Sequence, residues 1–189
     1  MRERLAQEAA RLMAEEGVRD FGLAKRKAAQ HLGVLDTQHM PGNAEVERAL
    51  SEYQRLFQAQ TQPAALRRRR ELALEVMGFL QRFEPRLVGP VLSGTAGAHS
   101  EIELHVFDDC AEALAIFLME HNIPHQQAEK RLRVHKDQWQ FFPSYRFLAG
   151  DVGIEIVVFP ANGLRQPPLS PVDGKPLRRA AVETVRQLL

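Results

Sequence analysis

The sequence has little of several things: a single cysteine (Cys110), a single tryptophan and only two tyrosines among its 189 residues. One cysteine cannot close an internal disulfide, which excludes the class of small secreted domains that depend on such bridges. The chain also lacks the long apolar run of a membrane span or of a secretory signal. We therefore expect a cytoplasmic protein with no membrane partner.

The chain also has no large excess of charge of either sign. The 25 lysines and arginines nearly balance the 24 aspartates and glutamates, for a formal net charge of +1. This balance excludes a bulk attraction for nucleic acid, so any such binding needs a local patch. Hydrophobic residues make up 44% of the chain, which is enough for a sizeable core. The length suits one domain with an appendage, or two small domains.

Residues 1–60 have a helical pattern throughout. Leu5, Ala9 and Leu12 fall on one stripe, and Gly17 suits the end of that helix. Asp20 is placed to cap a second helix, and a third follows the turn residues Pro41 and Gly42. We predict an N-terminal helical region over residues 1–60 with three short helices.

From residue 61 onward the pattern predicts a separate α/β (or α+β) domain, over residues 61–189. A helix over 61–83 ends before Pro85, and the hydrophobic period then changes from 3.6 to 2. We expect a small mixed sheet of about five strands flanked by helices. The expected strands are 86–93, 101–107, a third within 123–135 whose second half is 130–134, 139–150 and 151–160, with helices at 108–122 and 177–189 and a proline- and glycine-rich tail between 161 and 176.

Three glutamates stand out against this apolar strand pattern. Side chains alternate along a strand, so Glu101, Glu103 and His105 share one face of the segment "EIELHVF". Glu155 is a lone acid in the apolar run "VGIEIVVF" and needs a basic partner or a metal. If the two strands are neighbours, three carboxylates converge. Hard oxygen donors of this kind suit one or two Mg²⁺ ions, with Mn²⁺ as a substitute, for phosphoryl transfer.

The arrangement of these residues resembles the nucleotidyltransferase superfamily, which includes the polymerase-β-like and minimal nucleotidyltransferases. The matching pieces are the turn Ser93-Gly94-Thr95, the acid-hydrophobic-acid strand from Glu101 to Glu103, and Glu155 on a later strand. The resemblance covers about residues 86–160. It implies that the turn contacts nucleotide phosphates, that Glu101, Glu103 and Glu155 are catalytic metal ligands, and that an NTP donates a nucleoside monophosphate to a hydroxyl acceptor.

Two other readings of the chain stay open. One is a divergent or inactive member, a non-catalytic module of the same scaffold that binds a nucleotide, RNA or a protein partner. The other is an interaction protein, for instance a homodimer, whose helical region forms the interface. In either case the glutamates form a solvated polar row or ion pairs, with Glu155 paired to Arg131, Arg133 or Arg146.

Basic and aromatic residues cluster in the third and fourth expected strands. The basic ones could bind a triphosphate or an RNA backbone, or could offset the acids; they are Lys130, Arg131, Arg133, Lys136 and Arg146. The aromatic ones are candidates for stacking on a base or for the core; they are Trp139, Phe141, Phe142 and Tyr145. The run "RRRR" at 67–70 covers a full helical turn, and a solvated helix end is its favoured reading.

Overall fold

The computed structural model describes residues 1–34 and 37–189, which form two compact units. The two remaining residues belong to the predicted N-terminal helical region and lie outside the described part. The first unit comprises residues 1–66, 95–100 and 171–173, and the second comprises 67–94, 101–170 and 174–189. Among the described helices, none combines the length and the apolar character needed to cross a membrane.

The first unit is helical, as predicted. It contains α1 (Arg2–Glu16), α2 (Phe21–His31), the 3₁₀ turn η1 (Thr37–His39) and α3 (Asn43–Phe57). Gly17 ends α1 in the left-handed conformation, at φ 69°, and the Asp20 carboxylate caps α2 by accepting a 2.6 Å hydrogen bond from the Leu23 amide. A small apolar core joins the helices through Leu5, Ala6, Ala9, Leu12, Ala24, Ala28 and Val46.

An ionic cluster lies on the polar side of α1. The Arg11 guanidinium donates to Glu8 at 2.8 and 3.0 Å and to Glu15 at 2.7 Å, and His31 Nδ1 lies 2.9 Å from Glu8. The hydrogen bonds from Arg11 outweigh partial burial and, with His31, lower the pKa of Glu8 to about 2. This cluster links the first two helices on the side away from their apolar contact.

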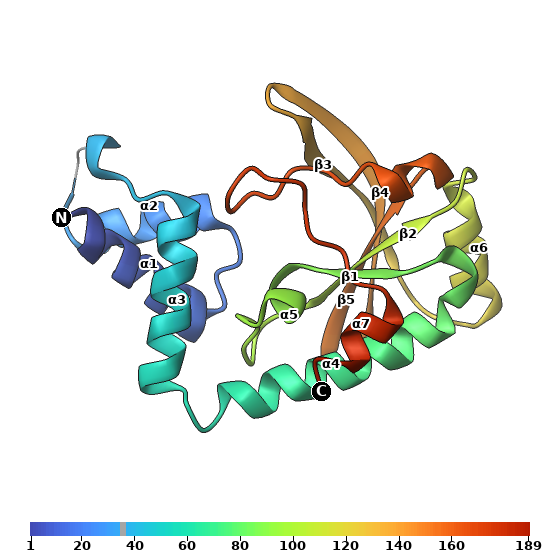
Figure 1. The fold of residues 1–189 in the computed structure, drawn as a ribbon, viewed down its shortest axis with the longest axis horizontal. Helices are drawn as coiled ribbons and strands as arrows, with labels where there is room; N and C mark the ends of the chain where they lie inside the picture. The colour runs from blue at the N-terminus through green and yellow to red at the C-terminus, as the bar shows by residue number, and fades with distance from the viewer. Residues whose placement is uncertain (35–36) are drawn as a thin grey trace. The chain divides into compact units, whose positions relative to one another are not determined.

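The second unit confirms the predicted mixed α/β class. Its five-stranded sheet has the order β1-β2-β5-β4-β3, in which only β2 and β5 are parallel (Figure 1). The strands are β1 (Arg86–Val88), β2 (Ile102–Phe107), β3 (Gln126–His135), β4 (Gln138–Ala149) and β5 (Val152–Phe159). The helical elements are α4 (Gln62–Phe79), η2 (Gln81–Phe83), α5 (Gly89–Ser93), α6 (Glu112–Glu120), η3 (Ala161–Arg165) and α7 (Val182–Arg186).

The two faces of the sheet differ in chemistry. One face is apolar and buried through Leu104, Ile156 and their neighbours in the rows Ile102 to Val106 and Ile154 to Val158. Helices α4 and α6 contact each other through Phe79 and Phe117, and Tyr145 on the apolar face donates to the Ala111 carbonyl beside α6. The other face carries Glu103, His105 and Glu155. We call it the acidic face.

Two predicted boundaries were wrong. Residues 86–93 are not one strand: the chain leaves β1 at Gly89, whose φ of +70° suits glycine, and Pro90 then starts the short helix α5. The third strand, Gln126–His135, agrees with the prediction. The C-terminal helix is only Val182–Arg186, because the chain before it is extended and pairs with β1.

The C-terminal segment touches both edges of the sheet. Leu169 donates its amide to the Arg133 carbonyl on β3, at 2.7 Å. Farther along, Ala180 and Leu87 of β1 exchange two backbone hydrogen bonds of 2.9 Å. One stretch of about a dozen residues thus satisfies backbone groups on the two outermost strands.

Candidate functional site

The expected neighbourhood of the acid-bearing strands is confirmed. Strand β5 lies parallel to β2, and Glu103 and Glu155 are register partners on the same face. Glu101 immediately precedes β2 and projects to the same side, over Gly153 of β5: a Cβ at residue 153 would lie 2.6 Å from Glu101 Oε1. The fold therefore gathers all three sequence-predicted carboxylates onto the acidic face of the two central parallel strands.

Two of these carboxylates share a cation that belongs to the protein itself. Lys130 Nζ lies 2.5 Å from Glu155 Oε2 and 3.8 Å from Glu103 Oε2. Lys130 comes from β3, so its side chain reaches across β4 to the acids. Burial alone would lower the pKa of Lys130, but the charges of Glu103 and Glu155 outweigh burial and raise it. The ammonium is therefore held in its charged form between the two acids.

Glu101 is held separately, by Arg146 of β4. Arg146 Nη2 donates to Glu101 Oε2 at 2.9 Å, and the Glu101 side chain is only 13% exposed. The backbone register of Arg146 is opposite Glu155, not Glu101. The expectation that Glu155 pairs with Arg131, Arg133 or Arg146 was therefore wrong, because the arginine at this register reaches one strand farther and leaves Glu155 to Lys130.

The donor set fits one hard cation better than two. Glu103 and Glu155 already approach one ammonium, so a single Mg²⁺ could replace it with these two ligands, the usual number when phosphate and water complete the shell. In the described part of the chain, no group of three or more His, Cys, Asp or Glu side chains is arranged to hold a metal ion. Glu101 would have to leave Arg146 before it could join.

The turn predicted to contact phosphates is divided between the two units. Ser93 ends α5, and Gly94 follows it in the left-handed conformation at φ 100°. Thr95 belongs to the helical unit, where its carbonyl oxygen accepts from Gln54 Nε2 at 2.7 Å. The structure gives Gly94 a local role, since its amide closes the last turn of α5 on the Pro90 carbonyl.

A different glycine lies against the acids, and the sequence analysis did not single it out as a site residue. A Cβ at Gly89 would lie 3.0 Å from the Glu103 carboxylate carbon, and the φ of +70° at this residue disfavours any side chain. The backbone between β1 and α5 thus comes close to the shared carboxylates. The signal in the sequence was Gly89-Pro90 directly after a strand, which marks a sharp change of direction.

Next along the acidic face, His105 is buried against a charged arginine. Its Nδ1 accepts from Arg179 Nε at 3.0 Å, so the ring proton lies on Nε2. Burial and then the positive charges of Arg179 and Lys130 hold the pKa of His105 well below its ordinary value. Arg179 stacks over Phe107 and Phe159 and donates to the Gly163 carbonyl at 2.7 Å; burial lowers its pKa to about 10.

The arginines of the run on α4 contact acidic side chains and backbone carbonyls of the protein itself. Arg67 pairs with Glu71 one turn along the helix, and Arg68 pairs with Asp151. Arg70 donates to the carbonyls of Val91, Leu92 and Leu188, which fixes the last turn of α5 and the end of the chain. Arg67 and Arg68 are exposed, as expected for a solvated helix end, but Arg69 is buried and Arg70 half-buried, so that interpretation was wrong for the second half of the run.

Comparison of the chain with protein-family models, with curated proteins and with solved structures returns no match. Function therefore has to be argued from the geometry of the acidic face.

Proposed function

We propose that the chain is a cytoplasmic nucleotidyltransferase that moves a nucleoside monophosphate from an NTP to a hydroxyl acceptor. The observation that carries this proposal is the register of Glu103 with Glu155 around one cation, Lys130 Nζ. Two carboxylates already arranged around one positive charge are suited to the Mg²⁺ that accompanies a triphosphate.

In this mechanism the ammonium of Lys130 gives up its place and pairs with phosphate oxygens. Glu103 and Glu155 would hold the metal, and Glu101 would join them only on separating from Arg146. Bound Mg²⁺ supplies charge neutralisation for the triphosphate and for the leaving pyrophosphate. The acceptor oxygen forms its bond to the α-phosphorus as the bond to the β-phosphate oxygen breaks, and Glu155 takes the hydroxyl proton.

A second candidate is the non-catalytic module that binds a nucleotide or another partner on the same scaffold. It is favoured by a specific observation: each of the three acids already has a basic partner without a metal, Glu103 and Glu155 in Lys130 and Glu101 in Arg146. In that case the ammonium would stay in place, and any bound nucleotide would contact Lys130 without hydrolysis or transfer.

Titration of the purified chain with each of the four NTPs, with and without Mg²⁺ or Mn²⁺, separates the two candidates. The readouts are the melting temperature and, with hydroxyl acceptors added, the release of pyrophosphate. A ligand at 100 times its Kd stabilises the folded state by about 2.7 kcal/mol, which a thermal scan detects. The nucleotidyltransferase shows metal-dependent stabilisation and turnover, and the module shows stabilisation alone.

The matched variants are Glu103→Gln with Glu155→Gln, and Glu183→Gln as the control. Glu183 lies on α7 and pairs only with the neighbouring Arg186 in an exposed position. The double variant should lose metal-dependent binding while the control keeps it. If the wild-type chain shows neither stabilisation nor pyrophosphate release with any NTP, the nucleotidyltransferase and a nucleotide-binding module both fail. If the double variant still binds Mg²⁺–NTP, the site lies elsewhere.

A further inference from the structure

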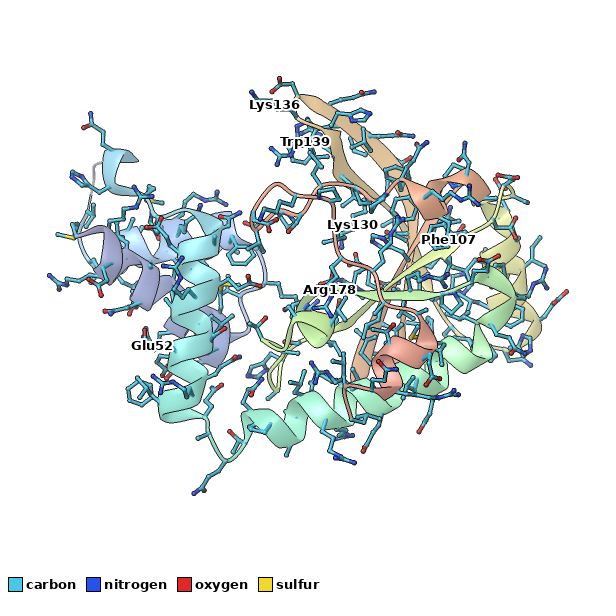
Figure 2. All side chains as sticks on the ribbon, in the orientation of Figure 1. Glu52, Phe107, Lys130, Lys136, Trp139 and Arg178 are labelled. Atoms are coloured by element: carbon cyan, nitrogen blue, oxygen red, sulfur yellow. The ribbon has the colours of Figure 1, made fainter. Side chains whose placement is uncertain are left out.

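The β3–β4 hairpin carries two exposed aromatic side chains on the face opposite the acids. Trp139 is 52% exposed and Phe141 is 61% exposed, although both lie inside a regular strand. Figure 2 shows Trp139 and Lys136 at the far end of this hairpin. Large aromatic groups are costly to leave in water, and most of the chain's other phenylalanines are buried or half-buried, so this pair calls for a partner.

Two arginines stand directly across from these rings. Arg133 is the register partner of Trp139, and Arg131 is the register partner of Phe141. The Arg131 guanidinium also lies over the Trp139 ring, 4.8 Å from its centroid. The four side chains therefore form one surface in which cations and rings alternate, here called the Arg–aromatic surface and defined as Arg131, Arg133, Trp139 and Phe141.

The surface keeps its positive charge. In the described part of the chain, the ion pairs of β3 and β4 involve Lys130 and Arg146, whereas Arg131 and Arg133 have none. Lys136 adds a charge at the turn, and the acids of the hairpin are Glu129 and Asp137. Three formal cations thus face two anions. Arg131 lies over the Trp139 ring, and Arg133 is opposite Trp139 in register with its guanidinium near Gly174.

We infer that the Arg–aromatic surface binds single-stranded nucleic acid. Bases would stack on Trp139 and Phe141, while Arg131, Arg133 and Lys136 would contact the phosphates between them. Exposed rings on a sheet face, interleaved with cations, match the two needs of an unpaired strand, because every base has a stackable face and every linkage has a negative charge. The net charge of the whole chain is only +1, so binding would depend on this surface.

Most other exposed apolar side chains are not aromatic, and the exposed Phe57 packs its ring against Tyr53 of the same helix. Leu148 and Met119, for example, are 72% and 67% exposed but are aliphatic. The inference rests on the hairpin alone and does not depend on the proposed transferase activity.

Trp139 makes the test direct because it is the chain's single tryptophan. Titration with unlabelled oligouridine of about ten nucleotides should quench its fluorescence saturably, since stacking brings a base onto the indole. Parallel titrations with single-stranded DNA of the same length, and with a duplex, show whether the 2′-hydroxyl contributes and whether unpaired bases are required. Raising the salt concentration should weaken binding. The logarithm of the binding constant should fall with the logarithm of the salt concentration, with a slope of about −0.7 per phosphate contact.

Variants are compared by anisotropy of a labelled oligonucleotide. Trp139→Ala, Phe141→Ala and the pair Arg131→Ala with Arg133→Ala should each weaken binding by about tenfold or more. Leu148→Ala, on the same strand but on the other face, should leave binding unchanged. Circular dichroism checks that each variant folds. We expect the two ring variants to fold because both rings are exposed.

Absence of quenching by every single strand would overturn the inference, as would a Trp139→Ala chain that binds like wild type. Sedimentation velocity supplies a further contrary outcome. If the chain forms a dimer that Trp139→Ala abolishes, and no oligonucleotide binds, then the surface is a self-association interface instead.

Discussion

Glu103 and Glu155 are register partners on the adjacent parallel strands β2 and β5. Lys130 of β3, which is two strands away from β5, lies between their carboxylates. Two like charges on neighbouring strands repel each other, and one of them would protonate more readily without a cation between them. Lys130 is therefore the residue whose replacement most directly tests whether this arrangement can accept a metal.

Replacing Lys130 by Met should destabilise the folded chain by about 1–3 kcal/mol at pH 7, because two half-buried carboxylates lose their shared partner. Millimolar Mg²⁺ should restore much of this loss in the variant, since a divalent ion can take the place of the ammonium, and should barely change wild type. Chemical denaturation with and without Mg²⁺ measures both effects. Lys136→Met, at the hairpin turn, is the control; equal insensitivity of all three chains to Mg²⁺ would rule out a shared divalent site.

Gly153 tests the position of Glu101. Gly153→Ala should cost about 1–3 kcal/mol of stability, because the added methyl group would meet the Glu101 carboxylate at 2.6 Å. In a Glu101→Ala background the same change should be neutral or stabilising by about 0.5–1 kcal/mol, the usual gain from replacing a strand glycine. A double-mutant cycle by urea unfolding measures the coupling. An equal cost in both backgrounds would place Glu101 away from Gly153.

Because His105 is buried, we expect the folded chain to lose stability in mild acid. Its pKa in the folded state lies well below the ordinary 6.5, so only the unfolded chain takes up this proton as the pH falls below about 6.5. The free energy of unfolding should then decrease by up to about 1.4 kcal/mol per pH unit from this group. His105→Gln, whose amide oxygen can still accept from Arg179, should flatten that part of the profile. The exposed His135, changed to Gln, should leave the profile unaltered.

Because Glu8 pairs with Arg11, we expect a second loss of stability at lower pH. Its pKa of about 2, against an ordinary 4.5, means that its contribution is complete above pH 4.5 and disappears as the pH falls toward 2. After allowance for solvent screening, we expect about 1 kcal/mol. Glu8→Gln should therefore be less stable than wild type near neutral pH and match it near pH 2. A difference that persists at pH 2 would mean that the carboxylate charge is not responsible.

Much of the fold could be read from the sequence because local patterns carried it. The alternation around Glu101 and Glu103 predicted a strand, the apolar run around Glu155 predicted another, and Asp20 marked the start of a helix. Each of these signals depends on residues close together in the chain, where hydrophobic period and capping chemistry decide the structure.

The pairings across the sheet could not be read in this way. Nothing near Lys130 in the sequence indicates that its side chain passes over β4 to reach Glu155, because that contact depends on strand order. Residues 86–93 were predicted as one strand, since the φ of Gly89 is not visible in a sequence. The exposed rings of Trp139 and Phe141 were equally compatible with the core, because strand aromatics are mostly buried and only the tertiary fold decides which are not.

The backbone contacts of the C-terminal segment with Leu87 and Arg133 have a consequence for the behaviour of the chain in concentrated solution. The outermost strands of an open sheet are where a foreign strand can add and begin an aggregate. Here one segment covers part of both margins, so a chain cut after η3 would expose them together and should form oligomers or fibrils where the intact chain does not.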